Sequence, residues 1–87
     1  MEGQTMWRYT IHVDGMMCGM CESHVNDAVR KAFPVKRVAS SRSKSETTVL
    51  AERELDEGTL RAAVSAAGYE VGEIRKEPWE KKGLFSR

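Results

Sequence analysis

The chain has 87 residues, a formal net charge of +1 and a hydrophobic fraction of 40%. This length fits one small domain, and the near balance of charge argues against a dedicated nucleic-acid-binding protein, which carries a clear basic excess. No apolar run approaches the roughly 18 residues of a membrane span, and the N-terminus lacks the hydrophobic region of a signal peptide. We therefore expect no transmembrane segment, no nucleic-acid partner and a cytoplasmic location.

The first half of the chain predicts a strand followed by a helix. Residues 7–13 alternate between apolar and polar side chains, which indicates a half-buried strand. His12 lies on the polar face of this strand, and we interpret it as a solvated residue rather than a ligand. Apolar residues at helical spacing predict a helix over residues 21–33, which Pro34 ends.

The second half of the chain predicts two strands, a second helix and a final strand. Residues 35–40 and 46–51 predict two strands joined by a polar turn. A second helix is predicted between Asp56, a good N-cap, and Gly68, a typical residue just after a helix end. A final strand begins near Tyr69. The order β-α-β-β-α-β predicts a split β-α-β sheet with both helices on one face.

The domain boundary is predicted near the end of that last strand. We assign residues 1–75 to one domain and residues 76–87 to a C-terminal tail, because the tail mixes charges with isolated apolar residues. The tail is expected to be flexible, and the alternative is a docking segment for a partner or a membrane surface.

The only two cysteines, Cys18 and Cys21, are separated by two residues. A disulfide between them would close a very small loop and would remove little chain entropy. In a reducing cytosol they are expected to be free thiols, and a Cys-x-x-Cys pair is then typical of a metal-binding or redox-active site. The predicted helix N-terminus at Cys21 favours the thiolate, which both binds metals and attacks disulfides.

The number of thiolates bears on the metal. Cu(I) accepts two thiolates, whereas Zn(II) prefers four ligands, and the chain has no second cysteine pair. His24 is a candidate third ligand that would shift the preference towards Zn(II) or another divalent ion; the alternative is an exposed helix residue. Met16 is expected to fill the core. Met17 and Met20 are expected to be exposed, and a thioether there could assist Cu(I) weakly.

The sequence around the cysteines resembles a known family. It is similar to the Gly-Met-x-Cys-x-x-Cys signature of heavy-metal-associated domains, which include copper chaperones and the N-terminal modules of copper-transporting P-type ATPases. The matching residues are Gly15-Met16-Met17-Cys18-Gly19-Met20-Cys21, then Val25 and Ala28-Val29, and near the end Gly68-Tyr69-Glu70-Val71.

The resemblance implies an α+β, ferredoxin-like sandwich with a four-stranded antiparallel sheet. It also implies Cu(I) binding by Cys18 and Cys21, a core role for Met16, and a position for Tyr69 close to the metal loop. The implied partner is a metal-transporting P-type ATPase or another acceptor domain with a dithiol.

Three functional hypotheses remain open at this point. The first is a Cu(I) chaperone or buffer without catalytic activity that passes its metal by thiol exchange, with Zn(II), Cd(II) or Hg(II) as other ions that thiolates bind. The second is a dithiol redox protein that uses Cys18 and Cys21. The third is an interaction module that recruits a partner. This hypothesis includes a monomer that forms a metal-linked dimer through shared cysteines.

Overall fold

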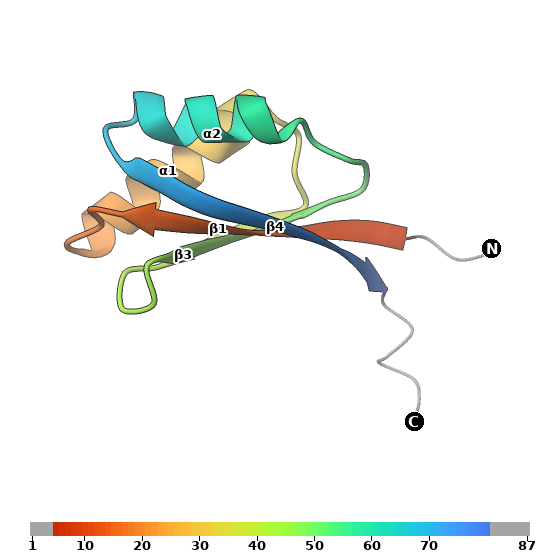
Figure 1. Ribbon diagram of the computed structural model, residues 1–87, viewed down its shortest axis with the longest axis horizontal. Coiled ribbons are helices and arrows are strands. Elements are labelled where there is room, and N and C mark those ends of the chain that lie inside the picture. Colours follow the sequence, from red (N-terminus) through yellow and green to blue (C-terminus); the bar gives the residue numbers. More distant parts are fainter. Residues whose placement is uncertain (1–4, 81–87) are drawn as a thin grey trace.

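A computed structural model describes residues 5–80 of the chain. Its elements follow the predicted order β-α-β-β-α-β (Figure 1), with bounds β1 Thr5–Asp14, α1 Gly19–Ala32, β2 Arg37–Ser41, β3 Glu46–Ala51, α2 Glu57–Ala66 and β4 Glu70–Glu80. Among these described residues, neither helix is long and apolar enough to cross a membrane.

The four strands form one antiparallel sheet in the order β2-β3-β1-β4, and both helices cover the same face of it (Figure 1). This is the ferredoxin-like sandwich that the sequence predicts. The alternation in β1 has the expected result, because Tyr9, Ile11 and Val13 are fully buried between the sheet and the helices. The helices contribute Val25 and Val29 from α1 to the same core, and α2 adds its own apolar residues.

The ends of α2 lie where the sequence places them. The carboxylate of Asp56 accepts a hydrogen bond from the Thr59 backbone amide at 2.9 Å, which satisfies one of the free N–H groups of the first turn. Gly68 follows the helix with φ of +102°, a left-handed conformation that favours glycine. These two residues therefore set the length of α2 and deliver Tyr69 to the start of β4.

The last strand is longer than predicted. Residues 76–80, expected in a tail, pair with the beginning of β1 and belong to the sheet, so the predicted tail boundary at residue 76 is wrong for these residues. Pro78 is tolerated there because β4 is an edge strand, where a missing N–H need not break the ladder. Lys76 lies over the Trp7 ring at 5.1 Å from its centroid. Residues 81–87, the rest of the predicted tail, lie outside the described residues.

A bulge in the β1–β4 pair brings His12 against Gly72. Ile11 pairs with Ile74 and Val13 pairs with Val71, so one residue of β1 opposes two residues of β4. A Cβ atom at Gly72 would lie 2.9 Å from Cδ2 of the His12 ring, closer than carbon atoms approach.

Replacing Gly72 with alanine should therefore destabilise the domain. We expect Gly72→Ala to lower the free energy of unfolding by about 1 kcal/mol, because the His12 ring must move to make room. Urea unfolding measures this change. In a His12→Ala background the same substitution should become neutral or slightly stabilising, and an equal loss in both backgrounds would contradict the steric explanation.

Candidate metal centre

A short loop connects β1 to α1 and carries Cys18, while Cys21 follows in the first turn of the helix. Gly15 begins the loop with a backbone φ of +104°, a conformation that residues other than glycine rarely adopt. A Cβ atom at Gly15 would be 3.4 Å from Cδ1 of Tyr69, so the loop passes directly beside the tyrosine ring. The turn at Gly15 thus places the loop that follows next to the start of β4.

The three methionines of the loop and of the first turn of α1 have different environments. Met16 is 7% exposed and packs in the main core, as expected from the sequence. Met17 and Met20 are 81% and 69% exposed, and they are the large apolar residues that lie open to solvent within residues 5–80. Met16 therefore anchors the loop, while the stretch from Met17 onwards is accessible to an incoming ion or partner.

The two cysteines meet at the N-terminus of α1. Cys18 is the N-cap residue in an extended conformation, and Cys21 lies in the first turn with its amide bonded to the Cys18 carbonyl at 3.0 Å. Both thiols are free, and their sulfur atoms are 3.9 Å apart. Two sulfur atoms that each lie about 2.3 Å from one ion can be separated by up to about 4.6 Å. The observed spacing therefore fits two thiolates that share one soft metal ion.

The local hydrogen bonds favour the thiolate of Cys21. A hydrogen bond with the Met17 backbone and another from the Tyr69 hydroxyl lower the pKa of Cys21 to about 7, from 9.0 for an ordinary thiol. The same contact with Cys21 raises the pKa of Tyr69, so the tyrosine stays protonated and acts as a donor. Cys21 is thus substantially ionised near neutral pH, which prepares it for metal binding or nucleophilic attack.

Removing the Tyr69 hydroxyl should weaken this preference. Tyr69→Phe deletes one donor to the thiolate, so we expect the pKa of Cys21 to rise from about 7 towards 9.0 and the fraction of thiolate at neutral pH to fall. The pH dependence of thiolate absorbance or of alkylation measures this, in a Cys18→Ser background that leaves one thiol. An unchanged midpoint would show that Tyr69 does not hydrogen-bond to Cys21 in solution.

His24 is not assembled with the cysteines. Its side chain is exposed and lines a surface groove between α1 and α2, together with Asp27 and Lys31. Within residues 5–80, no three His, Cys, Asp or Glu side chains gather closely enough to hold a metal ion. The geometry therefore presents a two-sulfur site, and ligation by His24 remains a hypothesis that would need its side chain to move.

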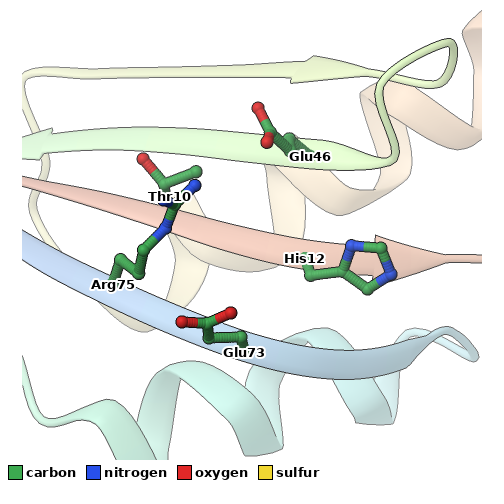
Figure 2. Close-up of a pocket in the computed structure, with 5 residues that line it drawn as sticks. All are labelled: Thr10, His12, Glu46, Glu73 and Arg75. Carbon is green, nitrogen blue, oxygen red and sulfur yellow. The ribbon is translucent and has the colours of Figure 1, made fainter.

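A second hollow lies on the face of the sheet opposite to the helices. It has a volume of about 250 Å³ and is lined by Thr10, His12, Glu46, Glu73 and Arg75 (Figure 2). It contains carboxylates on both outer sides, Glu46 on β3 and Glu73 on β4, and Nε2 of His12 lies 3.2 Å from Oδ1 of Asp14. This agrees with the interpretation of His12 as a solvated strand residue, and it leaves the cysteine loop as the candidate centre.

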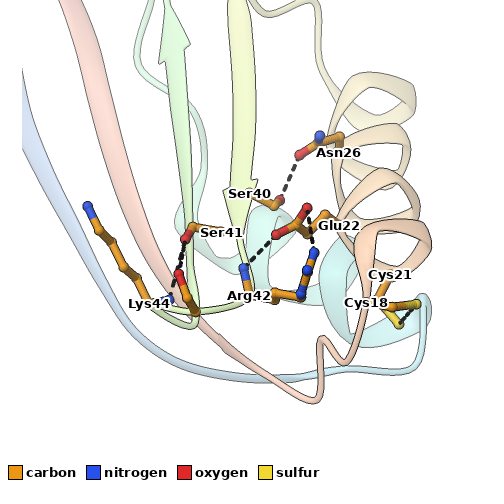
Figure 3. A network of polar contacts seen from close by, with 9 residues as sticks. Cys18, Cys21, Glu22, Asn26, Ser40, Ser41, Arg42 and Lys44 are labelled. Carbon is orange, nitrogen blue, oxygen red and sulfur yellow. Dashed lines mark hydrogen bonds and ion pairs between the residues drawn. The ribbon is translucent and has the colours of Figure 1, made fainter.

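The turn between β2 and β3 approaches the cysteine loop. A Cβ atom at Gly19 would lie 3.9 Å from Nη1 of Arg42, and Arg42 pairs with Glu22 in the first turn of α1 (Figure 3). Sequence reasoning missed both residues, because no spacing rule connects two charges on separate elements. The charge of Arg42 in a predicted turn was the one feature of the sequence that could have suggested this contact.

Known proteins resemble the chain in sequence and in structure. It is 32% identical over 79 residues to a mercuric reductase from Staphylococcus aureus. The N-terminal domain of ZntA in its Zn(II) form is 30% identical, with a TM-score of 0.68 over 82% of this chain and 92% of that one. The copper chaperone Atx1 from Synechocystis PCC6803 is 28% identical, with a TM-score of 0.65 over 72% of this chain and 97% of that one.

These matches differ in extent. The alignment with the mercuric reductase covers 91% of this chain but only 14% of that enzyme, so the chain corresponds to a small part of it. The two solved structures are matched over nearly their whole length. No protein-family model matches the chain.

Proposed function

The chain belongs to the family of heavy-metal-associated domains, and we propose that it binds one soft metal ion through Cys18 and Cys21 and passes it on by exchange of thiolate ligands. The observation that carries the proposal is the pair of free sulfur atoms 3.9 Å apart at the start of α1, one on an exposed and one on a partly buried cysteine. We assign the chain a role in metal binding and transfer rather than in catalysis.

Cu(I) is the ion that we propose as the preferred cargo. Two thiolates satisfy Cu(I), whereas Zn(II) prefers four ligands. The described residues offer no cluster of three donors that would complete a zinc site. The exposed thioethers of Met17 and Met20 are further soft donors beside the pair. The relatives include a copper chaperone, a domain solved in its Zn(II) form and a mercuric reductase. Zn(II) and Hg(II) are therefore the competing cargoes.

Transfer follows from the low number of ligands. An ion held by two sulfurs can accept a third thiolate from a partner before Cys18 or Cys21 leaves, so it never becomes a free ion. Cys21, whose pKa is about 7, can take up a proton near neutral pH when it is released. The proposed acceptor is a dithiol domain such as that of a metal-transporting P-type ATPase.

A competition titration tests the proposal. Under anaerobic conditions with a chromophoric Cu(I) chelator, the wild-type protein should withdraw one equivalent of Cu(I), and Cys18→Ser/Cys21→Ser should withdraw none. Ser23→Ala is the matched control, because it changes an exposed residue near the start of α1 without removing a sulfur donor. Parallel titrations with Zn(II) and Hg(II) rank the cargoes. Equal withdrawal by the double variant would exclude the proposal.

A dithiol redox function is the second candidate. It is favoured by the lowered pKa of Cys21 and the proximity of the second sulfur. A measured reduction potential and an insulin-reduction assay separate the two functions. Rapid turnover at a thioredoxin-like potential would favour redox chemistry, whereas tight metal binding without turnover would favour the proposed transfer function.

A further inference from the structure

The helix that carries the metal site begins without a side-chain cap. Cys18 occupies the N-cap position, where Ser, Thr, Asp or Asn would normally accept a hydrogen bond from the first turn, and it makes no such bond. A metal ligand therefore occupies the position that usually stabilises the start of a helix. The first turn of α1, and Cys21 with it, is therefore held in place by contacts other than a side-chain cap.

Glu22 makes one of these contacts, with the turn between β2 and β3. Its side chain is 24% exposed, and Oε2 accepts a hydrogen bond from the Arg42 backbone amide at 2.7 Å (Figure 3). The Arg42 guanidinium lies 3.7 Å from the other carboxylate oxygen and is 51% exposed. The short bond to the backbone is therefore the stronger of the two contacts, because exposed ion pairs contribute little.

A second contact holds the following turn of α1 to the same hairpin. The Ser40 hydroxyl donates to Oδ1 of Asn26 at 2.7 Å and lies 2.8 Å from the hydroxyl of Thr47. Thr47 is fully buried, so this chain of bonds reaches from the helix into the sheet. Glu22 and Asn26 are four residues apart and share one helix face. The β2–β3 hairpin is therefore hydrogen-bonded to two successive turns of α1.

We propose that Glu22 is a positioning residue for the metal site: by binding the Arg42 amide, it holds the first turn of α1 and keeps Cys21 within reach of Cys18 before the metal arrives. The inference rests on the proposed function, since it concerns the same two sulfur atoms. The 3.9 Å between them depends on the path of the chain from Cys18 to Glu22. The Cys18 carbonyl accepts from both the Cys21 and Glu22 amides, which links the three residues directly.

Three variants separate the parts of this contact. Glu22→Ala removes the acceptor, Glu22→Gln keeps a side-chain oxygen for the Arg42 amide but removes the charge, and Arg42→Ala removes the guanidinium but keeps the amide. Asp27→Ala is the control, because Asp27 is an exposed acidic residue of the same helix whose carboxylate pairs with Arg30. Cu(I) affinity is measured by competition, and amide hydrogen exchange is measured on the metal-free protein.

We expect Glu22→Ala to weaken Cu(I) binding about tenfold, the lower end of the effect of residues that orient metal ligands. It should also accelerate exchange of the Arg42 and Cys21 amides several-fold. Glu22→Gln should restore both values to within about twofold of wild type, and Arg42→Ala and Asp27→Ala should resemble wild type. Thermal unfolding is recorded for every variant, so that affinity is compared only between folded proteins.

Three results would overturn the inference. One is wild-type affinity in Glu22→Ala, which would leave Glu22 a purely structural role even if the melting temperature falls. Another is an equal loss in Glu22→Gln, which would assign the effect to charge. The third is unchanged exchange of the Arg42 amide. If the wild-type protein binds no metal, the proposed function fails, and the exchange data alone then decide whether Glu22 holds the first turn.

Discussion

Tyr9→Phe should lower the free energy of unfolding by about 2–4 kcal/mol, a large share of the stability of a domain of this size. The Tyr9 side chain is fully buried, and its hydroxyl makes two hydrogen bonds with one residue. It donates to the Leu55 carbonyl at 3.1 Å and accepts from the Leu55 amide at 2.7 Å. Phenylalanine fills the same space but leaves both backbone groups without a partner. Urea denaturation monitored by circular dichroism measures the loss.

The control for this prediction is Tyr69→Phe. Tyr69 is only half-buried, and its hydroxyl bonds to a thiol rather than to a buried backbone group. It should therefore cost less than about 1 kcal/mol. The comparison keeps the chemical change constant and varies only the surroundings. Similar losses at the two positions, or a loss below about 1 kcal/mol for Tyr9→Phe, would show that the contact with Leu55 does not stabilise the connection between β3 and α2.

Replacing a single cysteine should have the largest effect on metal binding. We expect Cys18→Ser and Cys21→Ser each to weaken Cu(I) affinity by roughly 1000-fold or more, because even residues that only orient a ligand change affinity by about 10–100-fold. A hydroxyl remains protonated at neutral pH and is a hard donor, so it does not replace a thiolate. Competition titration at fixed pH gives both affinities.

Stability provides the control for the cysteine variants. Cys18 is exposed and Cys21 is only partly buried, so serine at either position should change the free energy of unfolding by less than about 1 kcal/mol. A loss of binding with preserved stability therefore reports on the ligands themselves. If one variant kept the wild-type affinity, that cysteine would not be a ligand, and a different donor would have to be found.

The parts of the fold that depend on local patterns could be predicted from the sequence. The alternation in residues 7–13 indicated β1, and Asp56 and Gly68 marked the ends of α2. These features act within a few residues, where hydrogen bonding and steric rules are strong. The predicted location of the candidate site at the junction of β1 and α1 has the same origin, because the two cysteines are only three positions apart around the start of the helix.

The features that depend on distant partners could not be predicted. Residues 76–80 look like a charged tail in isolation. They form a strand because their backbone pairs with the N-terminal half of β1. The contact of Glu22 with Arg42 joins two elements that no sequence spacing relates. The position of His24 in the groove between the helices depends on how α1 is rotated against α2. In each case tertiary packing decided among several conformations that the local sequence allows.

X-ray absorption spectroscopy of the Cu(I)-loaded protein would identify the ligands of the ion, because it counts the atoms bound to the metal. With one equivalent of Cu(I) and a monomeric protein, we expect two sulfur neighbours in the wild type and the loss of one of them in Cys18→Ser. A coordination shell of nitrogen or oxygen atoms, or a two-sulfur shell that persists in Cys18→Ser, would contradict the assignment of Cys18 and Cys21 as the pair that holds the ion.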